Sequence, residues 1–210
     1  MIRNLFKKLI RKKTPEERAR QQLFAVNLNK NDIAIDCGAN VGTITHHLSR
    51  SGATVYAFEP NPYAFQKLKE RFSDNQNVIC IQNGVLDKNK TGKLYFHEFS
   101  DKNEVLWSTG SSLVDFKENI LKGKYIEIPV IDLAEFIKSL DSRVKLLKID
   151  VEGVECSIIN KLINTGIIDI IEYIFVETHD HKIPRLKAET DKLRKIIKQR
   201  KIKNINLDWT

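Results

Sequence analysis

The apolar residues of the chain follow two spacings that alternate along most of its length. Short apolar runs predict strands, and between them apolar residues recur every three or four positions, which predicts helices with one buried face. Strands that alternate with helices form a parallel sheet with right-handed crossovers. We therefore predict an α/β fold, with a Rossmann-like, doubly wound and mostly parallel sheet. The expected strands cover residues 33–37, 54–58, 77–82, 145–150 and 170–177, with an edge strand at 205–209.

Residues 87–143 interrupt this alternation with strand patterns and a polar segment. A capping box of Asp132 and Glu135 then predicts a short helix. We interpret 87–143 as a β-rich insertion between the third and fourth core strands, whose polar part covers the acceptor site as a lid. Its expected parts are a turn at Thr91-Gly92, strands at 93–99 and 124–130, and a polar segment at 107–112.

The first 31 residues precede the predicted sheet and form a basic helical segment. Residues 1–13 place apolar side chains on one helical face and Lys or Arg on the other, which suits an anionic membrane surface. The alternative is that the apolar face packs on the domain. Thr14, followed by Pro15 and two acids, predicts the cap of a second helix. We therefore divide the chain into this segment, 1–31, and one domain, 32–210.

The net charge of +8 is concentrated near the two ends of the chain. Residues 1–20 carry eight Lys or Arg against two Glu, and residues 182–203 carry ten against two acids. The segment between them, 21–181, is mildly acidic. A basic groove through the core, typical of nucleic-acid enzymes, is therefore not expected. A small-molecule or glycan acceptor is favoured, and the oligomeric state stays open.

The composition predicts a cytoplasmic protein. No stretch reaches the roughly 20 apolar residues of a membrane span, and the first residues lack the pattern of a secretory signal. Cys37, Cys80 and Cys156 are widely separated and lack a zinc-binding spacing, which predicts reduced thiols. Peripheral contact with the inner membrane face through residues 1–13 is a further option.

Residues 36–43, DCGANVGT, join the first predicted strand to the first helix. Ligands of doubly wound sheets bind at the carboxyl ends of strands, where Gly38 permits a tight turn and Gly42 permits close packing of the helix. A dinucleotide fingerprint needs glycines where Asn40 and Thr43 stand, because the backbone must cradle a pyrophosphate. S-adenosylmethionine has no phosphate, and the acid at the strand end can accept from its ammonium group, directly or through water. The residues assigned to this cofactor are Asp36, Gly38, Asn40, Gly42 and Thr43.

Two later segments extend the predicted cofactor site. Glu59 ends the second strand, 23 residues after Asp36, where an acid can accept hydrogen bonds from both ribose hydroxyls. Asn83, Gly84 and Val85 follow the third strand and are placed to meet the adenine. The alternative is a strand-end acid and turn glycines with purely structural roles.

Four segments together resemble the FkbM-type methyltransferases, within the class I S-adenosylmethionine-dependent fold. The resemblance runs from about residue 32 to residue 179 and implies methyl transfer, usually to an oxygen of a sugar, glycolipid, polyketide or other secondary metabolite. A full class I sheet has seven strands, the last of them antiparallel, whereas this sequence shows one late strand, so we expect the far edge of the sheet to be either truncated or completed by the insertion. The segments are 36–42 (DCGANVG), 58–62 (FEPNP), 147–155 (LKIDVEGVE) and 175–179 (FVETH), and a fifth, 110–113 (GSSL), is also similar.

A hydroxyl acceptor must lose its proton to a base or be acidified by a metal. We predict Asp150, Glu177 and His179 as catalytic, with Asp150 also beside the cofactor, because they follow neighbouring strands at the cofactor's edge of the sheet. The same three could bind a divalent cation, but their scattered positions argue against a metal. Acids in the first turn of a helix are favoured by the helix dipole, which is the simpler interpretation of Glu155 and an equal alternative for Glu152.

Three competing functions remain at this point. The basic pI of about 9.3 is compatible with an RNA methyltransferase, although no aromatic and basic residues interleave as in a stacking platform. A nicotinamide enzyme is disfavoured by the missing glycines. A non-catalytic S-adenosylmethionine-binding protein is the third, because a fold does not fix a function.

Overall fold

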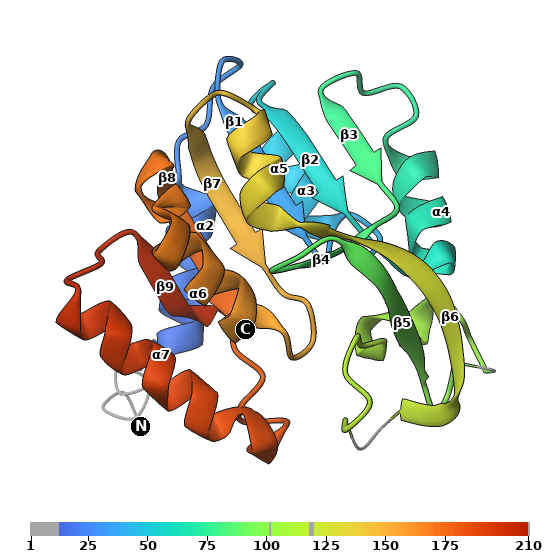
Figure 1. Ribbon diagram of the computed structural model, residues 1–210. Coiled ribbons are helices and arrows are strands. Elements are labelled where there is room, and N and C mark those ends of the chain that lie inside the picture. Colours follow the sequence, from blue (N-terminus) through green and yellow to red (C-terminus); the bar gives the residue numbers. More distant parts are fainter. Residues whose placement is uncertain (1–12, 101, 118–119, 210) are drawn as a thin grey trace, which may run out of the picture.

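The computed structural model describes residues 13–100, 102–117 and 120–209, and in them the chain forms a six-stranded and a three-stranded sheet (Figure 1). All neighbouring strands of the larger sheet run parallel. The predicted Rossmann-like α/β fold is therefore confirmed. The strands, in spatial order, are β3 (Val78–Ile81), β2 (Thr54–Phe58), β1 (Ile33–Cys37), β7 (Val144–Ile149), β8 (Ile171–Glu177) and β9 (Ile205–Trp209).

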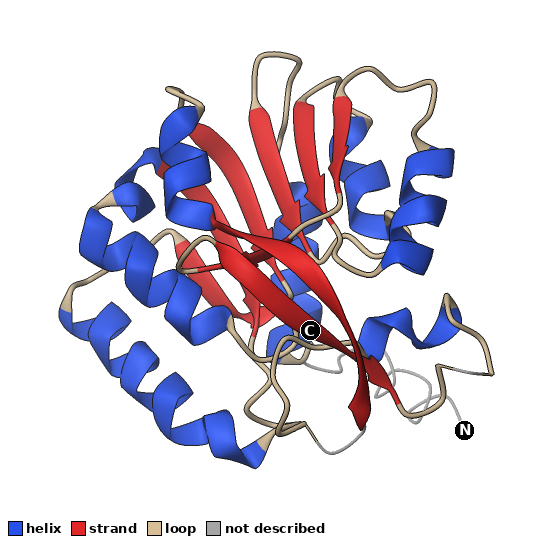
Figure 2. Cartoon of the chain, turned by 45° about the vertical axis from the view of Figure 1, so that its right-hand side comes forward, coloured by secondary structure: helices blue, strands red, loops and turns tan. Residues whose placement is uncertain are grey.

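Helices cover both faces of the six-stranded sheet (Figure 2). Successive side chains of a strand point to opposite faces: Ala34 of β1 packs with residues of α2, α3 and α4, whereas Ile35 packs with residues of α5, α6 and α7. The hydrophobic core therefore consists of two layers with the sheet between them. The helices are α2 (Pro15–Ala25), α3 (Thr43–Ser49), α4 (Pro62–Arg71), α5 (Leu133–Ser139), α6 (Glu155–Thr165) and α7 (Lys187–Gln199).

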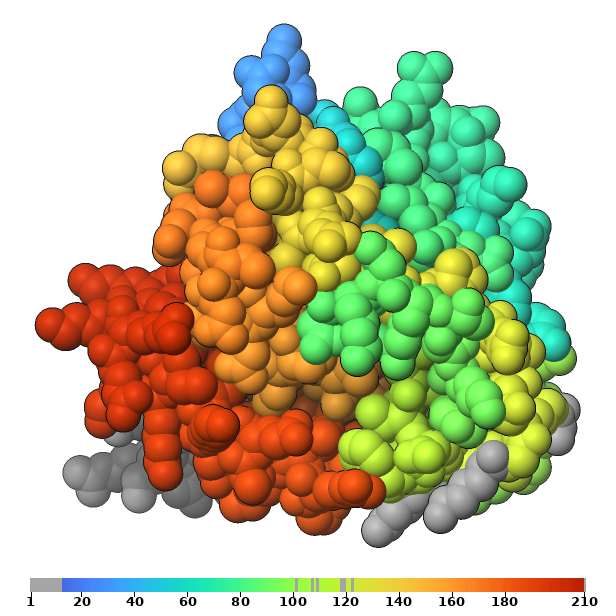
Figure 3. All heavy atoms as spheres, viewed as in Figure 1, coloured from blue at the N-terminus to red at the C-terminus, as the bar shows by residue number. Residues whose placement is uncertain are grey.

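The three-stranded sheet lies beyond the carboxyl ends of the parallel strands (Figure 1). Its strands β5 (Lys90–His97) and β6 (Ile120–Asp132) form an antiparallel pair, and β4 (Gly84–Leu86) pairs with β6 in parallel. Val154, directly before α6, packs against its small apolar core. In the space-filling view the green surface of β4 and β5 meets the orange surface of α6 and its neighbouring loops (Figure 3). The second sheet thereby forms a wall beside the strand ends.

The two strands predicted in the insertion are present, β6 with wider bounds and β5 shifted toward the N-terminus, but the predicted turn at Thr91 and Gly92 is wrong. Both residues lie within β5 and pair with β6, and the chain bends at residues 87–89 instead. A Cβ on Gly92 would lie 2.7 Å from a methyl group of Val130. The glycine therefore permits close packing within the small sheet and does not form a turn. β4 also begins before residue 87, so the second sheet is larger than the predicted insertion.

One predicted helix cap is complete and the other is modified. The Glu17 backbone N–H donates to Thr14 Oγ1 (3.2 Å), the N-cap bond that the sequence predicted. In addition, the Thr14 N–H donates to the Glu17 carboxylate (3.0 Å), which completes a capping box. Asp132 caps α5, but the Glu135 carboxylate accepts from Asn89 Nδ2 (2.6 Å), while Asn89 Oδ1 accepts from the Asp132 N–H (2.7 Å). The asparagine therefore links the β4–β5 turn to the start of α5.

β9 is an edge strand, as predicted, but it runs parallel to β8. The described sheet thus has six parallel strands, without the antiparallel seventh strand of a full class I sheet, and the described strands of the insertion form a separate sheet and do not complete its edge. The predicted basic helix over residues 1–13 lies outside the described residues, apart from Lys13. No helix in the described part of the chain is long and apolar enough to cross a membrane.

Candidate active site

The loops after β1, β2, β7 and β8 surround a cavity of about 290 Å3. The second sheet and the short helix η1 (Leu106–Gly110) close it on the other side. Its wall includes four acids, Glu59, Asp150, Glu152 and Glu177. The structure therefore brings most of the predicted cofactor residues, and two of the predicted catalytic residues, to one cavity. Other predicted residues that line it are Gly38, Asn40, Asn83, Gly84 and Val85.

Gly38 holds the loop after β1 close to the end of β7. Its φ of 76° is in the left-handed region, and a Cβ at this position would collide with the carbonyl oxygen of Asp150. Only glycine combines this backbone angle with such a close approach. The glycine therefore positions the loop after β1 against Asp150, directly after β7.

Glu59 is buried at the end of β2, where backbone groups hold both of its oxygens. The Asn40 N–H donates to Oε2 and the Asn61 N–H donates to Oε1, both at 2.8 Å. Burial raises the pKa of this carboxyl to about 7, although the two backbone hydrogen bonds act in the opposite direction. A carboxylate fixed in this way faces the cavity in a single orientation.

Two asparagines, one in the loop after β1 and one in the loop after β2, connect these loops to the segment around η1. Asn40 has a left-handed φ of 49° and donates from Nδ2 to Ser108 Oγ (2.8 Å). Asn61 caps α4 with its side-chain oxygen and donates from Nδ2 to Ser111 Oγ (3.1 Å). Ser108 and Ser111 both line the cavity. The polar segment predicted at 107–112 therefore lies across the cavity from the loops after β1 and β2.

Asp36 lies behind the cavity wall, fully buried, and does not line it. Thr45 Oγ1 donates to its Oδ2 (2.7 Å), and Lys148 Nζ lies 3.2 Å from its Oδ1. Lys148 also donates to the Gly38 carbonyl (2.8 Å) and lies 3.4 Å from Asp150 Oδ2. Burial alone would lower the pKa of Lys148, but the carboxylates of Asp36 and Asp150 raise it above its usual value. Asp36 therefore contacts the site only indirectly, through the ammonium group of Lys148, which it helps to hold in place.

No role for Lys148 was expected from the sequence. The only available signal was the second of two lysines in a strand whose other residues are apolar, VKLLKI. A buried charge in such a strand needs an ionic partner, but the partner's identity depends on how the strands pair.

Gly42 and Thr43 begin α3 and do not line the cavity. A Cβ on Gly42 would overlap the side chains of Phe72 and Leu68. The glycine therefore permits close packing at the start of the helix, which the sequence also suggested. The Thr43 side chain is exposed.

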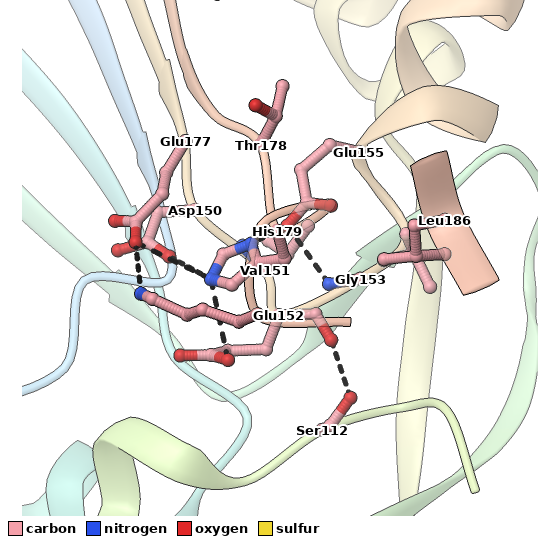
Figure 4. Close-up of polar contacts among 12 residues, drawn as sticks. Ser112, Asp150, Val151, Glu152, Gly153, Glu155, Glu177, Thr178, His179 and Leu186 are labelled. Carbon is pink, nitrogen blue, oxygen red and sulfur yellow. Dashed lines mark hydrogen bonds and ion pairs between the residues drawn. The ribbon is translucent and has the colours of Figure 1, made fainter. Parts of the chain in front are cut away.

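The loop after β7 carries two acids with opposite pKa shifts. Burial raises the pKa of Asp150 to about 6, while Lys148 acts in the opposite direction. Burial would also raise the pKa of Glu152, but His179 and Lys117 lower it to about 2. Glu152 has a left-handed φ of 61°, a strained angle for a residue with a side chain. This backbone angle turns its carboxylate toward His179 (Figure 4).

His179 is fully buried after β8, at the centre of four carboxylates (Figure 4). Its Nδ1 lies 2.8 Å from Glu155 Oε1, which also accepts from the Gly153 N–H (3.0 Å). Its Nε2 lies 3.4 Å from Glu152 Oε2, 3.6 Å from Glu177 Oε1 and 3.7 Å from Asp150 Oδ1. Burial would lower the pKa of the ring, but Glu152 and Glu155 raise it to about 10. His179 does not line the cavity.

Two lysines that sequence analysis did not assign complete this charged group. Lys117 Nζ contacts Glu152 Oε2 (2.6 Å) and donates to the Gly110 carbonyl (3.0 Å). Lys182 lines the cavity and contacts Glu177 Oε1 (2.7 Å). Each lysine lies in a loop, and no local pattern in the sequence distinguishes it from a solvated surface lysine.

The parallel sheet and its strand-end cavity define the chain as a Rossmann-like α/β protein with the architecture of methyltransferases. The chain belongs to the FkbM methyltransferase family, because the family model described as Methyltransferase FkbM domain matches residues 36–202. This match confirms the resemblance seen in the sequence.

Two relatives and one solved structure are similar to this chain. Methyltransferase 1 of Beauveria bassiana is 28% identical over 163 residues, which are 70% of this chain and 65% of the relative. A probable ribosomal RNA small subunit methyltransferase A of Methanococcoides burtonii is 34% identical over 59 residues, 28% of this chain and 22% of that protein. The crystal structure of methyltransferase FkbM from Methylobacillus flagellatus superposes with a TM-score of 0.50 at 17% identity, over 82% of this chain and 39% of the other. The chain therefore spans less than two thirds of each of them.

Proposed function

We propose that this protein transfers the methyl group of S-adenosylmethionine to a hydroxyl oxygen of a sugar, glycolipid or other secondary-metabolite acceptor. The observation that carries the proposal is that one cavity holds a rigid acid after β2, Glu59, and a separate group of acids around Asp150 and Glu177. Membership of the FkbM family supports methyl transfer. Asn40 and Thr43, at positions where a dinucleotide site has glycines, favour S-adenosylmethionine over a nicotinamide cofactor.

The cofactor half of the proposed site is built around Glu59. Two backbone N–H groups fix its oxygens, and each oxygen keeps a lone pair that can accept from a ribose hydroxyl. Asn83 and Val85 line the neighbouring wall, where adenine would lie. The methionine part would then extend past Gly38 toward Asp150. Asp36 contributes by holding Lys148, which in turn holds this loop.

The acceptor half lies between the ends of β7 and β8. In the proposed reaction the acceptor oxygen forms a bond to the methyl carbon while the carbon–sulfur bond breaks, and the sulfur keeps the electron pair. Asp150 orients the acceptor hydroxyl, and the Glu177 carboxylate receives its proton. His179, predicted as an alternative base, lies outside the cavity wall, so we assign it a positioning role among the acids.

The segment around η1 is the proposed lid over this site. Ligand pockets usually measure about 300–1,000 Å3, so the cavity of about 290 Å3 holds one ligand and leaves little space for a second. The hydrogen bonds from Asn40 to Ser108 and from Asn61 to Ser111 join this segment to the cofactor loops. We propose that the insertion, residues 87–143, opens there to admit the acceptor.

An RNA acceptor is the second candidate, because one relative with a 59-residue match is named as a probable ribosomal RNA methyltransferase. The charges around the cavity favour a small acceptor instead. Lys117, Lys148 and Lys182 are each paired with a carboxylate, which leaves these three ammonium groups less able to bind phosphates.

The test is methyl transfer from radiolabelled S-adenosylmethionine to a panel of sugars, glycolipids and RNA, together with calorimetric titration of S-adenosylmethionine and NAD. We expect label on a hydroxyl compound and at least tenfold weaker binding of NAD. Equal affinity for NAD would remove the cofactor assignment. Label on RNA alone would favour the second candidate.

A further inference from the structure

The Nε2 atom of His179 is buried without a hydrogen-bond partner among the described residues. Three carboxylate oxygens surround it at 3.4–3.7 Å. Charged N–H to carboxylate hydrogen bonds are shorter, about 2.7–2.9 Å. The carboxylates therefore approach the ring from several sides without forming such a bond, although an unpaired polar atom in this environment is costly.

We propose that Asp150, Glu152 and His179 bind a divalent cation at the inner end of the cavity. One ligand atom from each of the three lies within 4.8 Å of the other two. A cation with bonds of about 2.1 Å sets neighbouring ligand atoms roughly 3.0–3.4 Å apart in octahedral or tetrahedral coordination. The Nε2 distances of 3.4 Å to Glu152 and 3.7 Å to Asp150 are close to this spacing. Small side-chain rotations would complete the coordination.

Glu155 provides the support that metal-binding histidines usually have. Its carboxylate lies 2.8 Å from His179 Nδ1, and it is itself fixed by the N–H groups of Val151 and Gly153 (3.3 and 3.0 Å). When Nδ1–H donates to this carboxylate, the lone pair of Nε2 points toward Asp150 and Glu152. A carboxylate behind the imidazole fixes the tautomer and the ring orientation in many metal sites.

The charges around the ring also fit a divalent cation. Five acids contact His179 or Lys148, and three lysines contact these acids. Nε2 carries no proton when it ligates the cation, so in that state the five carboxylates and three ammonium groups leave two excess negative charges, which the cation balances. Lys117 shares Glu152 Oε2 with the proposed cation, so binding there also affects a contact of the lid segment. The acids are Asp36, Asp150, Glu152, Glu155 and Glu177, and the lysines are Lys117, Lys148 and Lys182.

The position of the cation suggests what it would contribute. Asp150 and Glu152 line the cavity, whereas His179 lies behind them, so the cation would present its open coordination positions to the acceptor. A bound hydroxyl becomes more acidic and is held in a fixed orientation. An acceptor with two neighbouring oxygens, such as a sugar diol, fits such a site. This role rests on the proposed function, whereas cation binding itself does not.

The test is titration of the chelator-treated full chain with Mn2+, followed by electron paramagnetic resonance of the free ion, with Zn2+ and Mg2+ as competitors. We expect one equivalent to bind, and Glu152→Gln and His179→Ala each to weaken binding at least about tenfold. Glu172→Gln is the matched control, because Glu172 is an exposed acid on β8, paired with Lys145 away from the site. Its affinity should equal that of the wild type.

Lack of saturable binding of Mn2+ and Zn2+, or unchanged affinity in Glu152→Gln, overturns the proposal. Circular dichroism checks folding, and if the buried His179→Ala variant does not fold, Glu152→Gln decides the question alone. Binding of S-adenosylmethionine is measured in parallel. Cation binding without cofactor binding would contradict the proposed function but leave the cation site in place. Cofactor binding without cation binding would overturn the cation site but leave the proposed function in place.

Discussion

The two halves of the candidate site hold their acids in different ways. In the cofactor half, backbone N–H groups of Asn40 and Asn61 fix the carboxylate of Glu59. In the acceptor half, the acids around His179 are held mainly by other charged side chains. A backbone cradle depends on the course of one or two loops, whereas a charged cluster depends on every member. We therefore expect the position of Glu59 to be insensitive to substitutions in the acceptor half. In the acceptor half, a change in the charge of one residue should alter the protonation of all the others.

Lys148 joins the halves, and its removal gives the largest expected effect on stability. Lys148→Met leaves the buried carboxylate of Asp36 without its cation, which should lower the free energy of unfolding by about 3–5 kcal/mol. Urea denaturation measures this loss. Lys145→Met is the control, because Lys145 pairs with the exposed Glu172 on the same sheet, and should cost less than about 1 kcal/mol. Equal losses would contradict the joining role of Lys148.

Removal of the proposed base should affect the rate of methyl transfer but not the affinity for the cofactor. Glu177→Gln keeps the size of the side chain but cannot take a proton, so kcat should fall about 10²–10⁴-fold. The affinity for S-adenosylmethionine should stay close to that of the wild type, because Glu59 is unaffected. Steady-state rates with an identified acceptor and calorimetry with the cofactor give the two values. Full activity in this variant would assign the proton to another residue.

The smallest expected effect is a pH dependence confined to the cofactor half. Burial raises the pKa of Glu59 to about 7, so its carboxylate becomes charged as the pH rises through that value. The charged form accepts ribose hydrogen bonds better, and the affinity for S-adenosylmethionine should increase from pH 6 to pH 8 by up to about tenfold. In Glu59→Gln the increase in affinity between pH 6 and pH 8 that comes from this carboxyl group should disappear. The same pH profile in both proteins would show that another group titrates.

The difference between the halves also explains how far the sequence could predict them. The cofactor half lies at the ends of β1 and β2, within residues that are close in the chain, and strand 33–37 was predicted with the bounds that the structure has. Gly38, Asn40 and Glu59 line the cavity as expected. Local spacing was sufficient, because each residue follows a strand whose end is visible in the sequence.

The acceptor half combines residues that the sequence separates widely. Lys117 and Glu152 are 35 positions apart, and the contact that joins Lys148 to Gly38 of the cofactor half spans 110. Their meeting depends on the packing of the second sheet and on strand pairing, which the alternation of apolar residues does not specify. The turn assigned to Thr91 and Gly92 failed for a related reason, because a glycine needed for close packing resembles one needed for a turn. Asp36 was placed on the correct strand end, but its partner Lys148 was not foreseen.

The central claim is that Glu59 binds the cofactor independently of the acids in the acceptor half. Calorimetric affinities for S-adenosylmethionine in the wild type, Glu59→Ala and Glu177→Gln test it most directly. We predict that Glu59→Ala weakens binding by about 1.5–3 kcal/mol, the cost of losing hydrogen bonds to a charged group, while Glu177→Gln leaves it nearly unchanged. Unaltered affinity in Glu59→Ala, or an equal loss in both variants, would contradict the account.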